Sequence, residues 1–82
     1  MKNPAVTIYG TWWCGYCFRT RQFFNKHKIS YQWVDIDEDQ NGEEFVIATN
    51  HGNRSVPTIL FEDGSILVEP TYAQLHEKLG IL

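Results

Sequence analysis

The sequence predicts an α/β domain in which a four-stranded mixed sheet is flanked by three helices, in the order βαβ–α–ββα. Short runs rich in β-branched residues alternate with segments whose apolar residues recur every three or four positions, which is typical of strands alternating with helices. The dipeptide Asp63-Gly64 stands between two of the strand-like runs and is a strong signal for an antiparallel hairpin. The chain contains no linker, repeat or low-complexity tract, so we expect one domain spanning residues 1–82.

The first half of the chain predicts a strand, a long helix and a second strand. The run AVTIY at residues 5–9 lies between Pro4 and Gly10, which favours a strand. Over residues 15 to about 28 the apolar positions recur at helical spacing and basic side chains stand near the end, so we expect a helix that buries one face. Its expected inward side chains are Cys17, Thr20, Phe23, Phe24 and His27. Residues 31–36 predict a second strand, which a right-handed crossover makes parallel to the first.

The second half predicts a short helix followed by a hairpin of two strands. Residues 43–50 favour a helix with Gly52 as its stop signal. Its expected inward side chains are Phe45, Ala48 and Thr49. Residues 56–61 and 66–68 favour the third and fourth strands, and the tight turn between them makes this pair antiparallel.

A last helix is expected to begin at Thr71. Thr71 and Gln74 have the spacing of a capping box, in which each side chain pairs with the backbone of the other residue. The expected inward side chains of this helix are Tyr72, Leu75 and Leu79. The sheet should carry helices on both faces, and in such open α/β sheets the active groups lie beyond the carboxyl ends of the strands. The turn after the first strand leads to Cys14, so we expect this residue at a functional position.

Composition and charge argue against several classes of function. The formal net charge of −3 disfavours a nucleic acid or an anionic membrane as partner. No run approaches the ~18 apolar residues of a spanning helix, and no long apolar run follows Lys2, so we expect no secretory signal. We therefore expect a cytoplasmic protein, in a compartment whose thiol pool removes ordinary structural disulfides.

The segment TWWCGYCFRT, residues 11–20, holds the only two cysteines of the chain. Cys14 falls at the expected start of the first helix, where unpaired N–H groups and the helix dipole favour a thiolate over a thiol. We therefore expect Cys14 to be a nucleophile at neutral pH. Cys17 lies one turn further on, at a separation that suits a disulfide, and we expect it to be a more buried resolving thiol. The pair is interpreted as catalytic, with a redox disulfide between Cys14 and Cys17.

Other uses of the two thiols remain open at this point. A structural staple is disfavoured because a bridge closing a loop of two residues constrains the unfolded chain very little. A structural zinc needs four ligands, and the histidines lie far apart without the H-x₃₋₅-H spacing, so we expect no metal site. An iron–sulfur cluster bridged between two chains, with Cys14 and external thiols as ligands, is a further alternative. Two inert core cysteines would rarely fall at a strand-to-helix turn.

Three aromatic residues accompany the cysteines. Trp12 is interpreted as a packing residue. Trp13 either braces the loop or forms an apolar wall that shields Cys14 and contacts substrate. Tyr16 lies between the cysteines on the first helical turn, and we expect it to line a substrate groove.

A second candidate segment is NRSVPTILF, at residues 53–61. Pro57 has no N–H to donate to a sheet. A cis bond before it would turn the backbone N–H and C=O of Val56 outward, ready to pair with an extended substrate. Arg54 is either a solvated loop charge or a cation close to the thiolate. An acidic run is interpreted as a solvated loop with helix-start charges and is assigned no chemistry: Asp35, Asp37, Glu38 and Asp39.

With C-x-x-C after the first strand and Val56-Pro57 before the third, the sequence resembles the glutaredoxins, which have the thioredoxin fold. The resemblance covers nearly the whole chain. The WCGYC motif, the GNRSVPT segment and DGS followed by Pro70 are most similar to the mycoredoxin branch. The resemblance implies that Cys14 is the attacking thiol, that Cys17 is the resolving thiol and that Pro57 is cis.

Some positions depart from the patterns of related families. Thr11 stands where glutaredoxins that bind glutathione carry a Lys, and Gly64-Ser65 stands where they have Gly-Gly followed by acidic residues. Compared with thioredoxin, Tyr16 replaces a Pro, and Ile8 replaces a buried acid that helps to deprotonate the second cysteine. The resemblance implies no bound cofactor, and a low-molecular-weight thiol of the mycothiol or glutathione type as co-substrate.

The sequence thus predicts a monomeric enzyme, a thiol–disulfide oxidoreductase that reduces mixed disulfides between proteins and a small thiol. One alternative is a dithiol redoxin that is recharged by a flavoprotein disulfide reductase and donates electrons to ribonucleotide reductase or a peroxidase. An alternative of another class is an iron–sulfur cluster-binding module. The expected substrate-binding residues are Trp13, Tyr16, Arg54, Val56 and Pro57.

Overall fold

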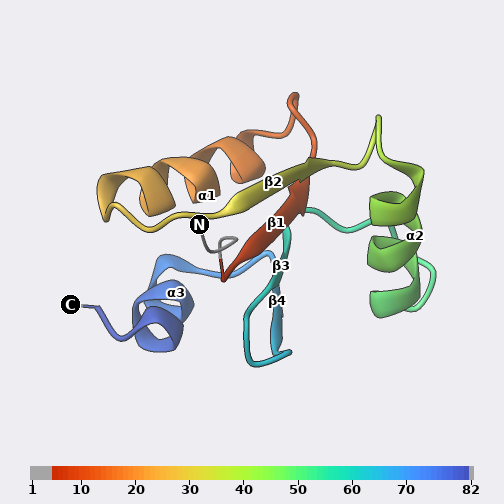
Figure 1. Cartoon of the computed structure of the whole chain (residues 1–82). Helices are drawn as coiled ribbons and strands as arrows, with labels where there is room; N and C mark the ends of the chain where they lie inside the picture. Colours follow the sequence, from red (N-terminus) through yellow and green to blue (C-terminus); the bar gives the residue numbers. More distant parts are fainter. Residues whose placement is uncertain (1–4, 82) are drawn as a thin grey trace.

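The computed structural model describes residues 5–81, and its elements follow the predicted order (Figure 1). Within these residues the elements are β1 (Thr7–Gly10), α1 (Gly15–Lys26), β2 (Gln32–Asp35), α2 (Gln40–Thr49), β3 (Thr58–Leu60), β4 (Ile66–Val68) and α3 (Tyr72–Leu79). The predicted α/β fold class, with its mixed sheet and flanking helices, is confirmed.

The described strands form one sheet in the order β2-β1-β3-β4. β1 runs parallel to β2 and antiparallel to β3, where Ile8 pairs with Ile59. β3 and β4 are antiparallel, as the hairpin signal predicted. Figure 1 shows α1 and α3 on one face of the sheet and α2 on the other. Because α1 follows β1 after a short turn, the N-terminus of α1 lies beyond the carboxyl end of β1.

The main core lies between the sheet and the layer formed by α1 and α3. Its buried side chains, among the residues described, are Val6, Ile8, Phe23, Phe24, Ile59, Phe61 and Leu75. On the opposite face Val46 is buried, and the rings of Tyr9 and Phe45 lie 4.7 Å apart. Gly42 lets α2 approach the sheet closely, because a Cβ at this position would lie only 2.6 Å from Val34 Cγ1. Both helical layers are therefore packed directly on the central strands.

The helix α2 begins earlier than the sequence predicted. It starts at Gln40 because the Asp39 side chain caps it, accepting a hydrogen bond from the Gly42 N–H at 2.9 Å. With this start, Gly42 and Val46 are the buried residues of the helix.

The inward prediction for Ala48 is wrong, since this residue is exposed. The predictions for His27 and Tyr72 as inward side chains are also wrong. α1 ends before His27, which is half-buried, and Tyr72 is 53% exposed. Both rings pack on Phe23 at the edge of the core, with centroids 4.5 and 5.5 Å from it. The other predicted inward residues of α1 are buried: Cys17, Thr20, Phe23 and Phe24.

Several predicted end signals are confirmed. Thr71 and Gln74 form the capping box, with N–H to oxygen distances of 2.8 and 3.1 Å. Gly52 follows α2 with φ of 97°, which favours glycine, and its N–H donates to the carbonyl of Ile47 at 2.8 Å. β3 begins at Thr58, later than predicted, because the preceding proline has no N–H to donate to the sheet.

Candidate active site

Cys14 and Cys17 lie at the N-terminal end of α1, where the sequence placed them. Cys14 is the N-cap residue, and its Sγ accepts a hydrogen bond from the Cys17 N–H at 3.3 Å. Both cysteines are free thiols; Cys14 is half-buried and Cys17 is fully buried. The first turn of α1 contains no acidic residue, so the unpaired N–H groups of the helix end meet no carboxylate of that turn. One accessible and one buried sulfur are therefore joined by a single helical turn.

Cys17 lies against the end of β1. A Cβ on Gly10 would lie 2.7 Å from the Cys17 sulfur and 2.7 Å from Cη2 of Trp33, so only glycine leaves room for this packing. Burial raises the pKa of Cys17 to about 12, and a hydrogen bond from the Thr11 backbone and the charge of Arg21 oppose the rise. The buried sulfur is therefore a protonated thiol in the reduced protein at neutral pH.

A carboxylate that the sequence analysis left without a role connects two predicted site residues. The Trp13 indole N–H donates to Asp37 at 2.8 Å, and the Arg54 guanidinium donates to the other oxygen of the same carboxylate. Arg54 also donates to Glu43 at 2.7 Å. The hydrogen bonds from Arg54 and Trp13 hold the pKa of Asp37 below its usual value. No local pattern signals this contact, because its partners lie 17 and 24 residues away in the chain.

The predicted aromatic residues lie at the surface around the cysteines. Trp13 is 72% exposed and Trp12 is 60% exposed. Trp12 packs on Trp33, with ring centroids 5.0 Å apart. The Tyr16 hydroxyl lies 2.6 Å from the backbone carbonyls of Glu69 and Pro70, so it ties the first turn of α1 to the loop before α3.

The segment around Pro57 has the geometry that the resemblance implied. The Val56–Pro57 bond is cis, Pro57 is buried and Val56 is half-buried. The carbonyl of Pro57 accepts a hydrogen bond from the Glu69 N–H at 2.9 Å. The backbone N–H and C=O of Val56 make no hydrogen bond to any other residue in the part of the chain described.

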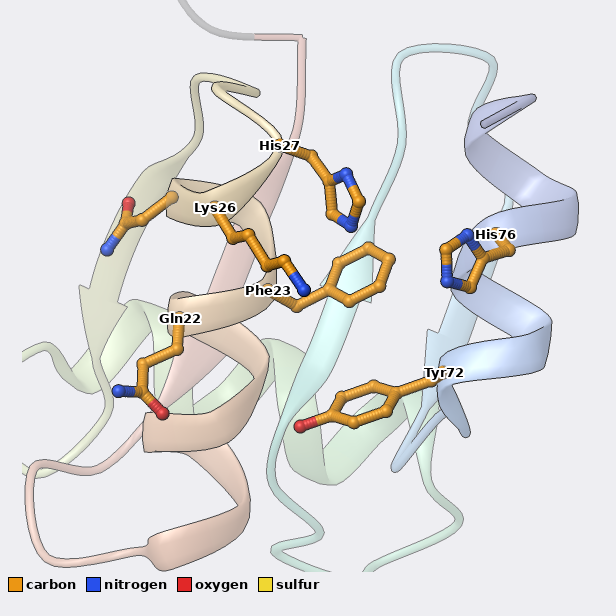
Figure 2. Close-up of a pocket in the computed structure, with 7 residues that line it drawn as sticks. Gln22, Phe23, Lys26, His27, Tyr72 and His76 are labelled. Carbon is orange, nitrogen blue, oxygen red and sulfur yellow. The ribbon is translucent and has the colours of Figure 1, made fainter. Parts of the chain in front are cut away.

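A groove lies at the other end of α1. This groove, of about 830 Å³, is lined by Gln22, Phe23, Asn25, Lys26, His27, Tyr72 and His76. Figure 2 shows the aromatic and histidine rings gathered between α1 and α3, and none of the predicted site residues is among them. Lys26 and His27 stand at the C-terminal end of α1, where positive charge complements the helix dipole.

Within residues 5–81, no three or more His, Cys, Asp and Glu side chains are grouped so as to hold a metal ion. None of the described helices has the length and apolar character needed to cross a membrane.

Comparison with known proteins adds independent information. A family model named Glutaredoxin matches residues 6–66. A Mycobacterium tuberculosis protein whose name places it among the glutaredoxins is 44% identical over 79 residues, covering 96% of this chain and 94% of the relative. Mycoredoxin 1 of Corynebacterium glutamicum is 36% identical over 77 residues, covering 94% and 95%. The crystal structure of a thioredoxin-like protein superposes with a TM-score of 0.84 over the full length of both chains at 20% identity, which supports the fold.

Proposed function

Because this chain belongs to the glutaredoxin family of thiol–disulfide oxidoreductases, we propose that it reduces mixed disulfides between proteins and a low-molecular-weight thiol. The observation that carries this proposal is the position of the Cys14 sulfur at the N-cap of α1, within hydrogen-bond distance of the Cys17 N–H. A helix N-terminus favours a negative charge, and a thiolate is the form of cysteine that attacks disulfides. Cys14 is therefore the attacking thiol of the proposed reaction.

In the proposed reaction the Cys14 thiolate attacks the small-thiol sulfur of the mixed disulfide. The bond from that sulfur to the client protein breaks, and the client thiolate leaves and takes up a proton. Cys14 now holds the small thiol. A second molecule of small thiol, attacking as its thiolate, then releases the first as a symmetric disulfide and regenerates Cys14.

A second route for the same intermediate uses Cys17. This thiol gives up its proton, attacks the Cys14 sulfur, forms the Cys14–Cys17 disulfide and expels the small thiol. Burial raises the pKa of Cys17 to about 12, so few molecules hold it ionised at neutral pH. This supports the one-cysteine route as the main one.

We propose a small thiol of the mycothiol type rather than glutathione. Thr11, at the position where glutathione-binding relatives are expected to carry a Lys, is buried. Arg54 already pairs with two carboxylates of this chain. The N-terminus of α3 is closed by the capping box of Thr71 and Gln74. Few charged groups are thus left for the charged ends of glutathione. The 36% sequence identity to Mycoredoxin 1 also supports a thiol of the mycothiol type.

The proposed client contacts include two aromatic residues next to Cys14 in the chain or in the first turn of α1. The exposed indole of Trp13 offers a flat apolar surface, and Tyr16 is half-buried in that turn. The unpaired backbone of Val56 is suited to an extended client segment, with Pro57 packed beneath it. Arg54 donates to the Asp37 carboxylate, which also accepts from the Trp13 indole, and so helps to hold Trp13 in place.

A second candidate function is a dithiol redoxin that a flavoprotein disulfide reductase recharges. It is favoured by the single helical turn between the two thiols, which suits an internal disulfide. In either case we propose a monomer that acts in the cytoplasm, where small thiols are kept reduced.

The test uses one labelled client protein carrying each candidate small thiol in turn as a mixed disulfide. Wild-type protein and Cys17→Ser are assayed for release of the label, with the matching small thiol as reductant. We expect fastest release for the mycothiol-type adduct, and Cys17→Ser to keep at least about half of the rate. Faster release of glutathione would overturn the co-substrate assignment. Loss of activity in Cys17→Ser, with recharging by a reductase and NADPH, would establish the dithiol redoxin instead.

A further inference from the structure

Three buried polar side-chain atoms without hydrogen-bond partners belong to residues that lie near Cys17. Among the described residues, the buried side-chain polar atoms that lack a hydrogen-bond partner are Oγ1 of Thr11, Nε of Arg21 and Nε1 of Trp33. The backbone of Thr11 hydrogen-bonds to Cys17. The Trp33 ring and the Cys17 sulfur both approach the position that a Cβ on Gly10 would occupy. Unpaired buried groups are rare in native proteins and call for an explanation.

Arg21 is the charged member of this group. Its guanidinium lies over two indole rings, 4.5 Å from the centroid of Trp12 and 4.5 Å from that of Trp33. The ion pairs of residues 5–81 join other side chains, and none includes Arg21. Indole rings attract a cation without neutralising it. The charge of Arg21 is therefore not paired with a carboxylate, unlike that of Arg54, which forms ion pairs with Asp37 and Glu43.

The position of Arg21 places this charge beside the second thiol. Arg21 follows Cys17 by four residues on α1, and side chains with this spacing are neighbours on one helix face. The other groups facing the Cys17 sulfur are the Cys14 thiol and the Thr11 backbone N–H. Ile8, in β1, is buried and apolar, so it supplies no base to the thiol.

The nearest acidic position on the neighbouring strand is also accounted for. Asp35 pairs with Gly10 across the sheet, and its carboxylate accepts a hydrogen bond from the Asp37 N–H at 3.0 Å. Among these groups, Arg21 is thus the cationic side chain that favours the thiolate of Cys17.

We propose that Arg21, packed against Trp12 and Trp33, supports the thiolate of Cys17 in the closing step of the dithiol route. The inference rests on the proposed function and adds a residue to it. In this step the Cys17 thiol gives its proton to solvent, and its sulfur attacks the sulfur of Cys14. The Cys14–Cys17 bond forms, the bond from Cys14 to the small thiol breaks, and the small thiol leaves as a thiolate. Arg21 acts through Cys17 and is a positioning residue, because it touches no reacting substrate atom.

The test follows both steps with one aromatic disulfide, 5,5′-dithiobis(2-nitrobenzoate). Its reaction with the reduced protein releases one coloured thiolate when the mixed disulfide forms on Cys14 and a second when Cys17 closes the ring. Stopped-flow absorbance between pH 5 and pH 10 gives the rate of each phase. The variants are Arg21→Met, Arg21→Lys and, as the control, Arg19→Met, which removes an equal charge from an exposed position on the same helix.

We expect Arg21→Met to slow the second phase about fivefold at pH 7 and by a similar factor at each higher pH up to 10, because a partly buried charge near the sulfur is lost. Arg21→Lys should restore most of the rate, and Arg19→Met should stay within about twofold of the wild type. The first phase should change equally in Arg21→Met and Arg19→Met.

Equal second-phase rates in Arg21→Met and Arg19→Met at every pH would overturn the inference. Absence of the first phase at neutral pH in the wild type would instead overturn the proposed function. Circular dichroism verifies the fold of each variant, and Arg21→Gln replaces Arg21→Met if the latter is unfolded.

Discussion

The two ends of α1 carry contrasting surfaces. At the N-terminal end the Cys14 thiol is accessible and stands beside exposed indole rings. At the C-terminal end a groove is lined by residues that include Phe23, His27 and His76 (Figure 2). This groove has no thiol or carboxylate among its lining residues, whereas the N-terminal end holds both cysteines.

The helix itself accounts for the contrast. Its N-terminus favours negative charge and its C-terminus favours positive charge. Cys14 lies at the end that favours negative charge, and Lys26 lies in the last turn, at the end that favours positive charge. In this small protein, the candidate active site is located by its chemistry and not by the size of a cavity.

The largest loss of turnover is expected from Cys14→Ser, a change at the N-terminal end of α1. We expect this change to lower turnover of mixed disulfides by about a thousandfold or more, because it removes the attacking sulfur. Steady-state release of a labelled small thiol measures it. Residual turnover within tenfold of the wild type would remove the catalytic role from this end of the helix.

A smaller effect, on stability, should follow from filling the space between β1 and the buried thiol. Gly10→Ala places a methyl group 2.7 Å from both the Cys17 sulfur and the Trp33 ring. We expect the free energy of unfolding to fall by about 1–3 kcal/mol, as for overpacked cores. Urea denaturation measures it, with Gly15→Ala as the matched control because its Cβ would meet only Arg19 Nη1, at 3.5 Å. Equal stability of the two variants would show that the packing at β1 is loose.

Asp37→Asn tests how the surface at the Cys14 end is held. The variant loses the charged partner of Arg54 and Trp13, so we expect a two- to fivefold higher KM for a client protein with little change in kcat.

The same variant tests how stability depends on pH. The pKa of Asp37 is lowered in the folded protein, so its contribution to stability is present above the unfolded value of about 3.9. That contribution is lost as pH falls through the lower folded value. The stability difference between wild type and variant should therefore vanish in strong acid, as acid-to-neutral urea titrations would measure. A difference that persists below pH 2 would contradict this account.

The smallest effect on turnover is expected at the opposite end. His76→Gln removes a ring that lies 5.1 Å from the Phe23 centroid and a contact of Nδ1 with the Ile81 carbonyl at 3.3 Å. We expect turnover within about twofold of the wild type and a loss of about 0.5–1.5 kcal/mol of stability. The same label-release assay and urea denaturation serve here. A tenfold loss of turnover would mean that the groove belongs to the site.

Sequence patterns placed Cys14 and Cys17 at the start of α1 correctly because the relevant signals are local. The start of α1, the C-x-x-C spacing and the capping box of Thr71 and Gln74 depend on residues at most four positions apart. The hairpin between β3 and β4 depends on one tight turn. These elements form in the predicted order because backbone hydrogen bonding and turn geometry act over short stretches of chain.

Local sequence patterns did not predict the contacts that surround the two cysteines. Asp37 looked like one of several solvated carboxylates, yet it accepts hydrogen bonds from Trp13 and Arg54. Arg21 looked like an ordinary helix charge, yet the fold packs its guanidinium over two indole rings. Neither contact has a sequence spacing that marks it, because each depends on how separate elements pack together.

The sequence by itself determined the order of the elements, the family resemblance and the two sulfurs at the start of α1. Only the tertiary structure decided how deeply Cys17 is buried and which charges face the pair. The physical reason is range: helix ends and turns are set by neighbours in the chain, whereas burial and electrostatic environment arise when distant segments meet.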